Sequence, residues 1–234
     1  MNDVGSQVDN HLLSSLPSEV RERLEPHLER IDAELNKKIY GPYEEIEAVY
    51  FPINSMASIV ASTESGEMAE VGVVGREGAT GFDIAMGTNK SPHRSMFQIP
   101  GPAYRMSGSE FENEFKRNGV FHDRILSFVQ KFYAQVSQTT LCNRLHHVDE
   151  RLPRWLLMCH DRIDGDVLPL TQEFIALMLG ASRVSITLAA KDLQKIGYIR
   201  YVRGKITVLD REGLEDGSCE CYSIVKREYD RAYA

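Results

Sequence analysis

The stretch "LPLTQEFIALMLGASRVSITLAAKDLQKIGYIRYVRGKITVLD", residues 168–210, changes its hydrophobic period twice. Apolar residues recur at helical spacing first over 174–179 and again over 184–196. Gly180 separates the two runs, and glycine takes left-handed backbone dihedrals without a steric penalty. The pattern therefore predicts two short helices that meet at a sharp corner.

Local signals at both ends of these helices support the same interpretation. Thr171 and Ser182 are suitable N-caps for the first and the second helix. Alternating residues over 198–202 and 205–209 then predict two strands that pair across Arg203-Gly204. The alternative is a helical hairpin inside an enzyme, with a charged face toward solvent. The corner glycine, the two caps and the basic hairpin together favour a helix-turn-helix followed by a wing.

The second helix and the wing carry residue types that suit DNA. A helix N-terminus attracts phosphate through its free amides and its dipole. Arginine donates two hydrogen bonds to guanine in the major groove, whereas lysine and arginine on a wing meet the DNA backbone. The predicted DNA-contacting residues are Thr171, Gln172, Ser182, Arg183, Ser185, Lys191, Arg203 and Lys205, with Lys195 and Arg200 as further backbone contacts.

Charge is distributed unevenly along the chain. The 234 residues carry a net charge of −7, which argues against indiscriminate binding to nucleic acid. Residues 1–60 hold 5 basic and 11 acidic side chains, whereas residues 171–213 hold 7 basic and 4 acidic ones. A small positive face on an acidic body suits local, oriented contact with a polyanion.

Composition and termini point to an ordinary globular protein of the cytoplasm. Of the residues, 42% are hydrophobic and 26% are charged, as in typical globular domains. No run approaches the roughly 20 apolar residues that span a bilayer, so no membrane contact is expected. The N-terminal "MNDVGSQVDNHLLSSLPSEV" lacks the basic-then-apolar order of a signal peptide.

The region before the corner changes texture twice. Helical spacing predicts a helix from about Pro17 to Leu35. Short apolar runs separated by turn residues from Ile39 to Met106 predict a small antiparallel sandwich or barrel. A short helix is expected over 107–115. A long one over 120–147 has an apolar row that either core packing or a partner helix explains: Ile125, Val129, Phe132 and Val136.

This order of parts resembles the Crp/Fnr transcription regulators, most closely over Val148–Leu209, where "VDERLPRWLLMCHDRI" leads into the corner. The resemblance implies an α+β chain in three parts. Residues 1–119 would form a cyclic-nucleotide-binding-like jelly roll (a double-stranded β-helix) with an N-terminal helix, 120–147 the dimerisation helix and 148–234 the winged helix-turn-helix. It implies a homodimer on a roughly palindromic double-stranded DNA site, with RNA polymerase as a further partner.

The effector site of that family is only partly matched. The segment "ATGFDIAMGTNKSPHRSMF" offers Gly81, Arg94 and Ser95 in the family's order. Phe82 replaces the glutamate that would hold a ribose hydroxyl, and Val136, followed by Ser137, replaces the threonine that would contact the purine. The expected effector residues are therefore Gly81, Arg94, Ser95 and Ser137, and the effector is a small anion other than cyclic AMP, or none.

The recognition helix also departs from the family pattern. Arg183 matches the first base-reading arginine, but Val184 and Leu188 replace the glutamate and the second arginine. A different operator sequence is therefore expected. The rival interpretations are a regulator controlled by its abundance or by a partner protein, and a cyclic-nucleotide- or anion-binding module whose DNA-binding part is vestigial.

Other candidate sites are weaker. His146 and His147, with Asp149 and Glu150, have the side chains of a metal site, but adjacent histidines diverge by about 100° on a helix, which favours a polar helix end instead. Cys219-Glu220-Cys221 lacks the C-x-x-C spacing of zinc and thioredoxin-like sites. All four cysteines are expected to be reduced, and no metal or cofactor is predicted. No paired carboxylates, nucleophile elbow or phosphate loop supports an enzyme, so no catalytic residue is predicted.

Overall fold

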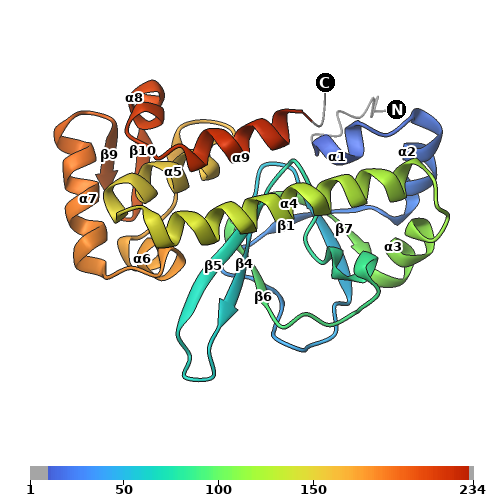
Figure 1. Ribbon diagram of the computed structural model, residues 1–234. Helices are drawn as coiled ribbons and strands as arrows, with labels where there is room; N and C mark the ends of the chain where they lie inside the picture. Colours follow the sequence, from blue (N-terminus) through green and yellow to red (C-terminus); the bar gives the residue numbers. More distant parts are fainter. Residues whose placement is uncertain (1–9, 232–234) are drawn as a thin grey trace.

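The computed structural model describes residues 10–231 and shows an α+β chain built around one long helix (Figure 1). The N-terminal part contains α1 (His11–Ser14), α2 (Ser18–Leu24), η1 (Glu25–His27), β1 (Glu29–Ala33), β2 (Lys38–Tyr40), β3 (Ala48–Pro52), β4 (Met56–Ser62), β5 (Met68–Val74), η2 (Phe82–Met86), β6 (Arg94–Ile99), β7 (Gly101–Ser107) and α3 (Gly108–Phe115). The long helix is α4 (Val120–Leu145). The C-terminal part contains α5 (Val148–His160), β8 (Val167–Leu168), α6 (Gln172–Leu179), α7 (Arg183–Lys195), β9 (Ile199–Val202), β10 (Lys205–Val208), α8 (Arg211–Asp216) and α9 (Cys221–Asp230).

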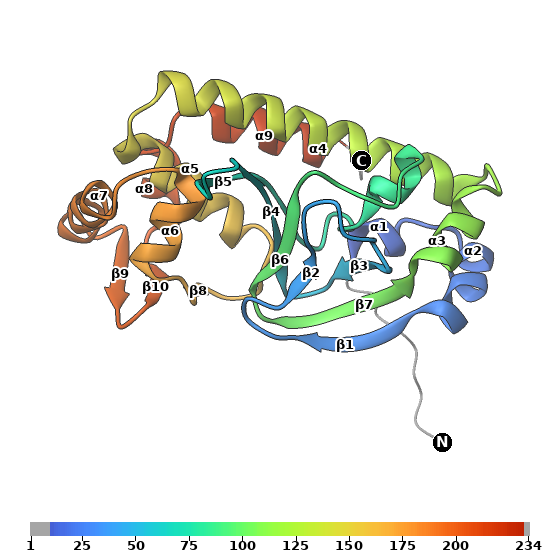
Figure 2. The same ribbon diagram turned by 90° about the horizontal axis from the view of Figure 1, so that it is seen from below.

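Two antiparallel sheets form the N-terminal sandwich, as the short apolar runs between turn residues predict. One sheet has the order β1-β7-β3 and the other the order β2-β6-β4-β5. Figure 2 shows α4 running across this sandwich, with α9 alongside it. Large apolar side chains fill the space between the sheets and α4, among them Phe51, Met106 and Phe128.

The predicted helix over 17–35 is too long. α2 ends at Leu24, a single 3-10 turn contains Pro26, and β1 begins at Glu29. Proline lacks the N–H that a helix interior needs. The apolar spacing continues beyond it because Ile31 packs against the sheet instead, on a strand that pairs with β7.

The long helix packs one face on the sandwich so closely that glycines are required beneath it. A Cβ on Gly78 would lie 1.9 Å from the Phe128 ring, and one on Gly72 would lie 2.7 Å from the Phe132 ring. Neither position tolerates a side chain, so the β5 strand and the turn after it approach α4 as bare backbone.

The C-terminal part shares its core with the sandwich. Met56, Val60 and Val73 of the sheet belong to the same buried cluster as Trp155 and Met178. The predicted divisions at residues 119 and 147 lie beside the ends of α4, while the outermost residues of the predicted first and last domains lie outside the described range.

Between residues 10 and 231, no single helix is long and apolar enough to cross a membrane; only the bent pair α6 and α7 meets that test together.

Candidate nucleic-acid interface

The corner between α6 and α7 forms as the sequence predicts. The two helices meet at 112°, and Gly180 takes the left-handed conformation at φ 55° and ψ 42°. Thr171 caps α6 because its side chain accepts from Phe174 N at 3.2 Å. Ser182 caps α7 by accepting from Ser185 N at 3.0 Å. Both caps satisfy amides that a helix start leaves without an intrahelical partner.

Further hydrogen bonds hold the corner rigid. The Gln172 side chain accepts from Thr187 Oγ1 at 2.8 Å, which ties the start of α6 to α7. The Gln172 N–H donates to Tyr201 Oη at 3.2 Å, which ties the same point to β9. The buried Arg151 guanidinium donates to Leu179 O at the end of α6. Gln172 is therefore engaged inside the domain and only half-exposed, although it is predicted to contact DNA.

The outer face of α7 is open. The helix buries Ile186, Ala189, Ala190 and Leu193 against the domain. Opposite these lie the exposed Arg183, Lys191 and Lys195, together with two exposed apolar residues, Val184 (69% exposed) and Leu188 (56%). Ser185 is half-buried, and its hydroxyl lies 2.8 Å from that of Ser182. The first turn of α7 thus presents one arginine and a serine cap to solvent.

The wing is a tight hairpin with two basic residues at its tip. Arg203 and Gly204 both have positive φ, 49° and 77°, as a two-residue hairpin turn requires. Val202 pairs with Lys205 across the turn. Arg200, Arg203 and Lys205 are exposed. A Cβ built on Gly204 would lie 3.3 Å from Thr171 Cγ2, so the tip of the wing lies beside the start of α6.

Gly81, Arg94 and Ser95 lie in one region, because Thr80 beside Gly81 lies within hydrogen-bond distance of Ser95 beside Arg94, whereas Ser137 is on α4. Gly81 takes φ 91° before η2, and Ser95 is fully buried with its hydroxyl 2.8 Å from Thr80 Oγ1. Arg94 is exposed at the start of β6. Ser137 lies on the exposed side of α4.

Aromatic rings occupy the position where the family's ribose-binding glutamate would lie. Phe82 is 4% exposed and packs edge-on against Phe128 and Phe132, with ring centroids 5.5 and 5.1 Å away. Its neighbour Asp83 is buried and accepts from Tyr40 Oη at 3.4 Å. The nearby buried Glu77 pairs with Arg162 at 2.7 Å.

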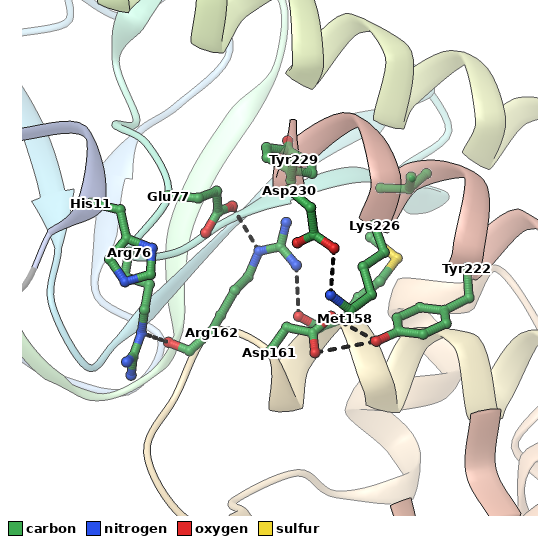
Figure 3. Close-up of a pocket in the computed structure, with 11 residues that line it drawn as sticks. His11, Arg76, Glu77, Met158, Asp161, Arg162, Tyr222, Lys226, Tyr229 and Asp230 are labelled. Atoms are coloured by element: carbon green, nitrogen blue, oxygen red, sulfur yellow. Dashed lines mark hydrogen bonds and ion pairs between the residues drawn. The ribbon is translucent and has the colours of Figure 1, made fainter. Parts of the chain in front are cut away.

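Figure 3 shows a separate cavity of about 190 Å³ between α9, the end of α5 and the turn after β5. Its charged groups bind one another: Arg162 pairs with Glu77, Lys226 with Asp230, and Tyr222 donates to Asp161. Ligand pockets usually exceed about 300 Å³. The cavity is therefore an internally paired joint between the two parts of the chain.

Comparisons with known proteins agree with the corner and the wing. Residues 150–216 match the Crp-like helix-turn-helix domain. These residues therefore form a Crp-like helix-turn-helix domain, and the chain as a whole has the fold of the solved Crp/Fnr regulators. No curated protein matches the sequence.

Several solved structures share the complete Crp/Fnr fold at low sequence identity. FixK2 from Bradyrhizobium japonicum is 15% identical with a TM-score of 0.69, over 82% of this chain and 98% of that one. TTHA1359, a CRP/FNR transcriptional regulator from Thermus thermophilus, is 18% identical with a TM-score of 0.63, over 80% and 97%. CLP from Xanthomonas campestris, a c-di-GMP-responsive global regulator, is 16% identical with a TM-score of 0.62, over 82% and 99%.

The predicted dimer row on the long helix of this Crp/Fnr fold is placed differently by the structure. Ile125 (0% exposed) and Phe132 (8%) face the chain's own core, and Val129 and Val136 lie at its border. Core packing therefore explains Ile125 and Phe132. The prediction that these two residues contact a partner helix is corrected. The open face of α4 carries other apolar residues: Leu126, Tyr133, Leu141 and Leu145.

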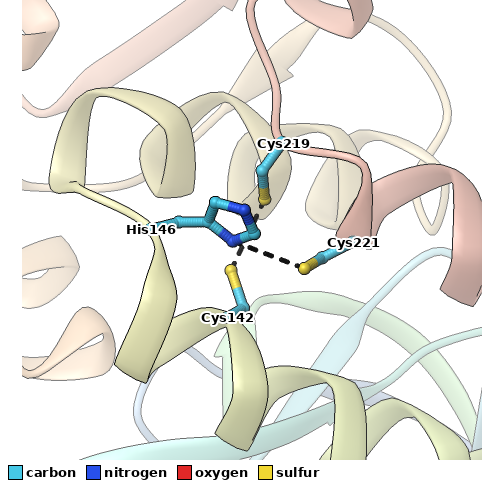
Figure 4. Close-up of side chains that lie close together, drawn as sticks. All are labelled: Cys142, His146, Cys219 and Cys221. Atoms are coloured by element: carbon cyan, nitrogen blue, oxygen red, sulfur yellow. Dashed lines mark hydrogen bonds between the residues drawn. The ribbon is translucent and has the colours of Figure 1, made fainter.

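Sequence reasoning missed one cluster. Cys142 and His146, one turn apart at the end of α4, lie against Cys219 and Cys221, which precede and begin α9 (Figure 4). The spacing Cys142-x-x-x-His146 was the available signal, because it places both side chains on one side of a helix.

Proposed function

We propose that this chain is a transcription regulator that binds a specific double-stranded DNA site as a homodimer. The observation that supports it best is the exposed first turn of α7, where Arg183 stands beside the Ser182 cap. An arginine at the open start of the second helix of such a corner is placed to read a base edge in the major groove. Lys191, Lys195, Arg200, Arg203 and Lys205 add phosphate contacts on either side.

The open face of α4 supports the homodimer. Leu126 is 43% exposed, Tyr133 72% and Leu141 48%, all on the side of the helix away from the sandwich. A two-fold axis along this face would place two copies of α7 on successive half-sites of a roughly palindromic sequence.

The sensor part supports control without cyclic AMP. Phe82 offers a cyclic nucleotide no hydrogen bond to its ribose, and its ring is fixed between Phe128 and Phe132. Arg94 remains exposed and is able to hold an anion. The regulator therefore responds to a different small anion or to none, in which case its abundance or a partner protein controls it; RNA polymerase is the expected partner on the promoter.

The test is selection of genomic fragments by the full chain, followed by titration of the selected site. We expect Arg183→Ala to weaken specific binding by about 1–3 kcal/mol and to relax the preference at one base pair of each half-site. Arg30→Ala, an exposed arginine on β1, is the matched control and should leave affinity unchanged.

Each outcome has a clear meaning. If no fragment is enriched, the vestigial-domain alternative replaces the proposal. If Arg183→Ala keeps the wild-type affinity and preference, the orientation of α7 on DNA is wrong. Micromolar cyclic-AMP binding that raises DNA affinity, measured by calorimetry and titration, would overturn the effector part.

A further inference from the structure

The cysteine cluster has the composition and the compactness of a metal site. Its four ligand atoms, three Sγ and one imidazole nitrogen, all lie within 4.8 Å of one another. Cys142 Sγ is 3.5 Å from Cys219 Sγ, and Cys221 Sγ is 3.5 Å from His146 Nδ1 (Figure 4). The three cysteines form a small buried cluster of their own, separate from the main core.

These distances suit a tetrahedron around one ion. Zinc lies about 2.3 Å from thiolate sulfur and about 2.0 Å from imidazole nitrogen, which puts two sulfurs about 3.8 Å apart and sulfur about 3.6 Å from nitrogen. A disulfide would need its two sulfurs at about 2.05 Å. The 3.5 Å pairs in this cluster are close to edges of the tetrahedron and far from a covalent bond.

Buried positive charge lies beside the cluster, and the neutral thiols and imidazole do not offset it. Arg151 and Arg154 are buried, and both act electrostatically on Cys142. The Nε of each has no hydrogen-bond partner among the described residues. A divalent ion with three thiolates and one neutral imidazole has a net charge of −1, which offsets buried guanidinium charge.

One further donor completes the second layer around the cluster. Gln138 Nε2, one turn before Cys142, donates to Cys221 Sγ at 3.1 Å. Hydrogen bonds to sulfur are the usual support of a metal-bound thiolate.

We propose that Cys142, His146, Cys219 and Cys221 bind one Zn²⁺ ion in a tetrahedral Cys₃His site. Three sulfurs and one imidazole favour Zn²⁺ over oxygen-seeking ions such as Mg²⁺. All four positions are supplied by protein, so the site is structural and leaves no open position for a substrate.

The site closes a long loop of chain around the DNA-binding domain. Its ligands flank residues 150–216, with one pair at the end of α4 and the other at the start of α9. Linking positions far apart in sequence restricts the unfolded chain, as a disulfide does. The ion would therefore fix the base of the helix-turn-helix domain to the long helix.

The test is metal analysis of the full chain, purified under reducing conditions from medium with added zinc. We expect one zinc ion per chain, and, after exchange, the visible d–d and thiolate charge-transfer bands of tetrahedral Co²⁺. Cys219→Ser and Cys221→Ser should each weaken zinc binding by more than about 100-fold, since even outer-layer changes cost 10- to 100-fold. Cys159→Ala, a buried cysteine outside the cluster, should keep the ion.

A pair of variants at the half-buried His146 guards against misfolding of the cysteine variants. His146→Cys should retain zinc with a changed Co²⁺ spectrum, whereas His146→Ala should lose most of its affinity. Asn143→Ala, exposed on the same turn, is the control.

Two results would overturn the site: a folded wild-type chain that takes up neither zinc nor Co²⁺, or mass spectrometry that finds a Cys142–Cys219 disulfide in its place. Equal loss of zinc in Cys159→Ala and Cys219→Ser would do so as well.

Discussion

Two regions of this molecule correspond to ligand sites in the Crp/Fnr pattern. The side chains of one are exposed to solvent, and those of the other are buried. The first turn of α7 keeps Arg183 and its serine cap in solvent, with Val184 69% exposed beside them. In the sandwich, the Phe82 side chain is only 4% exposed, and the neighbouring Asp83 accepts a hydrogen bond from Tyr40. One region offers groups to a partner, and the other uses them to hold the fold together.

The difference shows how far a resemblance extends to function. Matching residues carry over a binding site only where their polar atoms remain unpaired and accessible. At α7 they do. In the sandwich, the packed rings of Phe82, Phe128 and Phe132 replace the ribose contact, and Val136 on α4 offers the purine no hydrogen bond.

Substitutions on the exposed and the buried face of α4 give the sharpest comparison, and the largest effect is expected on the buried face. We expect Phe132→Asp to lower the free energy of unfolding by about 3–5 kcal/mol, because it buries an unpaired charge beside Phe82. Its neighbour Tyr133→Asp, at an exposed position, should change the free energy of unfolding by less than about 0.5 kcal/mol when both chains are measured at a concentration where they are monomeric.

Dimerisation should be affected by the substitution on the exposed face, Tyr133→Asp. If the open face of α4 is the dimer contact, Tyr133→Asp gives folded monomers in light scattering and weakens binding to a full palindrome by about 100-fold. A Tyr133→Asp chain that remains dimeric would move the contact elsewhere, and a stable Phe132→Asp chain would contradict the closed core.

The sequence predicted the elements whose determinants are local. The caps at Thr171 and Ser182, the corner at Gly180, the wing turn and the helix over 120–147 each depend on residues within a few positions. Non-local contacts decided the rest. Strand β1 forms because β7 pairs with it, and Cys142 meets Cys219 across 77 residues of sequence. Apolar periodicity on α4 located a buried face without showing that it faces the chain's own sheet.

The contact between β5 of the sandwich and α5 contains a titrating group, Glu70, which predicts the next largest effect. Glu70 on β5 is buried and accepts from Trp155 Nε1 of α5 at 2.7 Å and from Ser58 Oγ at 2.5 Å. Ser58 Oγ also lies against Gln98 Oε1, and its single proton cannot serve both acceptors. A proton on Glu70 completes this chain, and burial raises the pKa of Glu70 to about 7.

Stability should therefore fall as the pH rises. Between the ordinary carboxyl pKa of 4.5 and about 7, the folded chain binds more protons at Glu70 than the unfolded chain does. From pH 5 to pH 8 this lowers the free energy of unfolding by about 2 kcal/mol. Glu70→Gln should remove that slope in urea titrations at each pH, whereas the exposed Glu67→Gln should keep it. An unchanged slope in Glu70→Gln would place the titrating group elsewhere.

The smallest effect concerns how the open region reads DNA. Val184 and Leu188 are exposed apolar residues beside Arg183, where an aqueous surface alone would favour polar side chains. In the major groove, the C5 methyl group of thymine is the apolar feature that such side chains contact. We therefore expect the selected operator to have a thymine that contacts Val184. Replacing this thymine by deoxyuridine, which lacks the methyl group, should weaken wild-type binding by about 1 kcal/mol.

Val184→Ala should lose a similar amount of binding free energy on the thymine site. On the deoxyuridine site it should lose nothing more, because the contact is already absent. Val120→Ala, at the far end of α4, should behave as the wild type on both. If the two losses simply add in Val184→Ala, then Val184 does not touch that methyl group and its exposure has another cause.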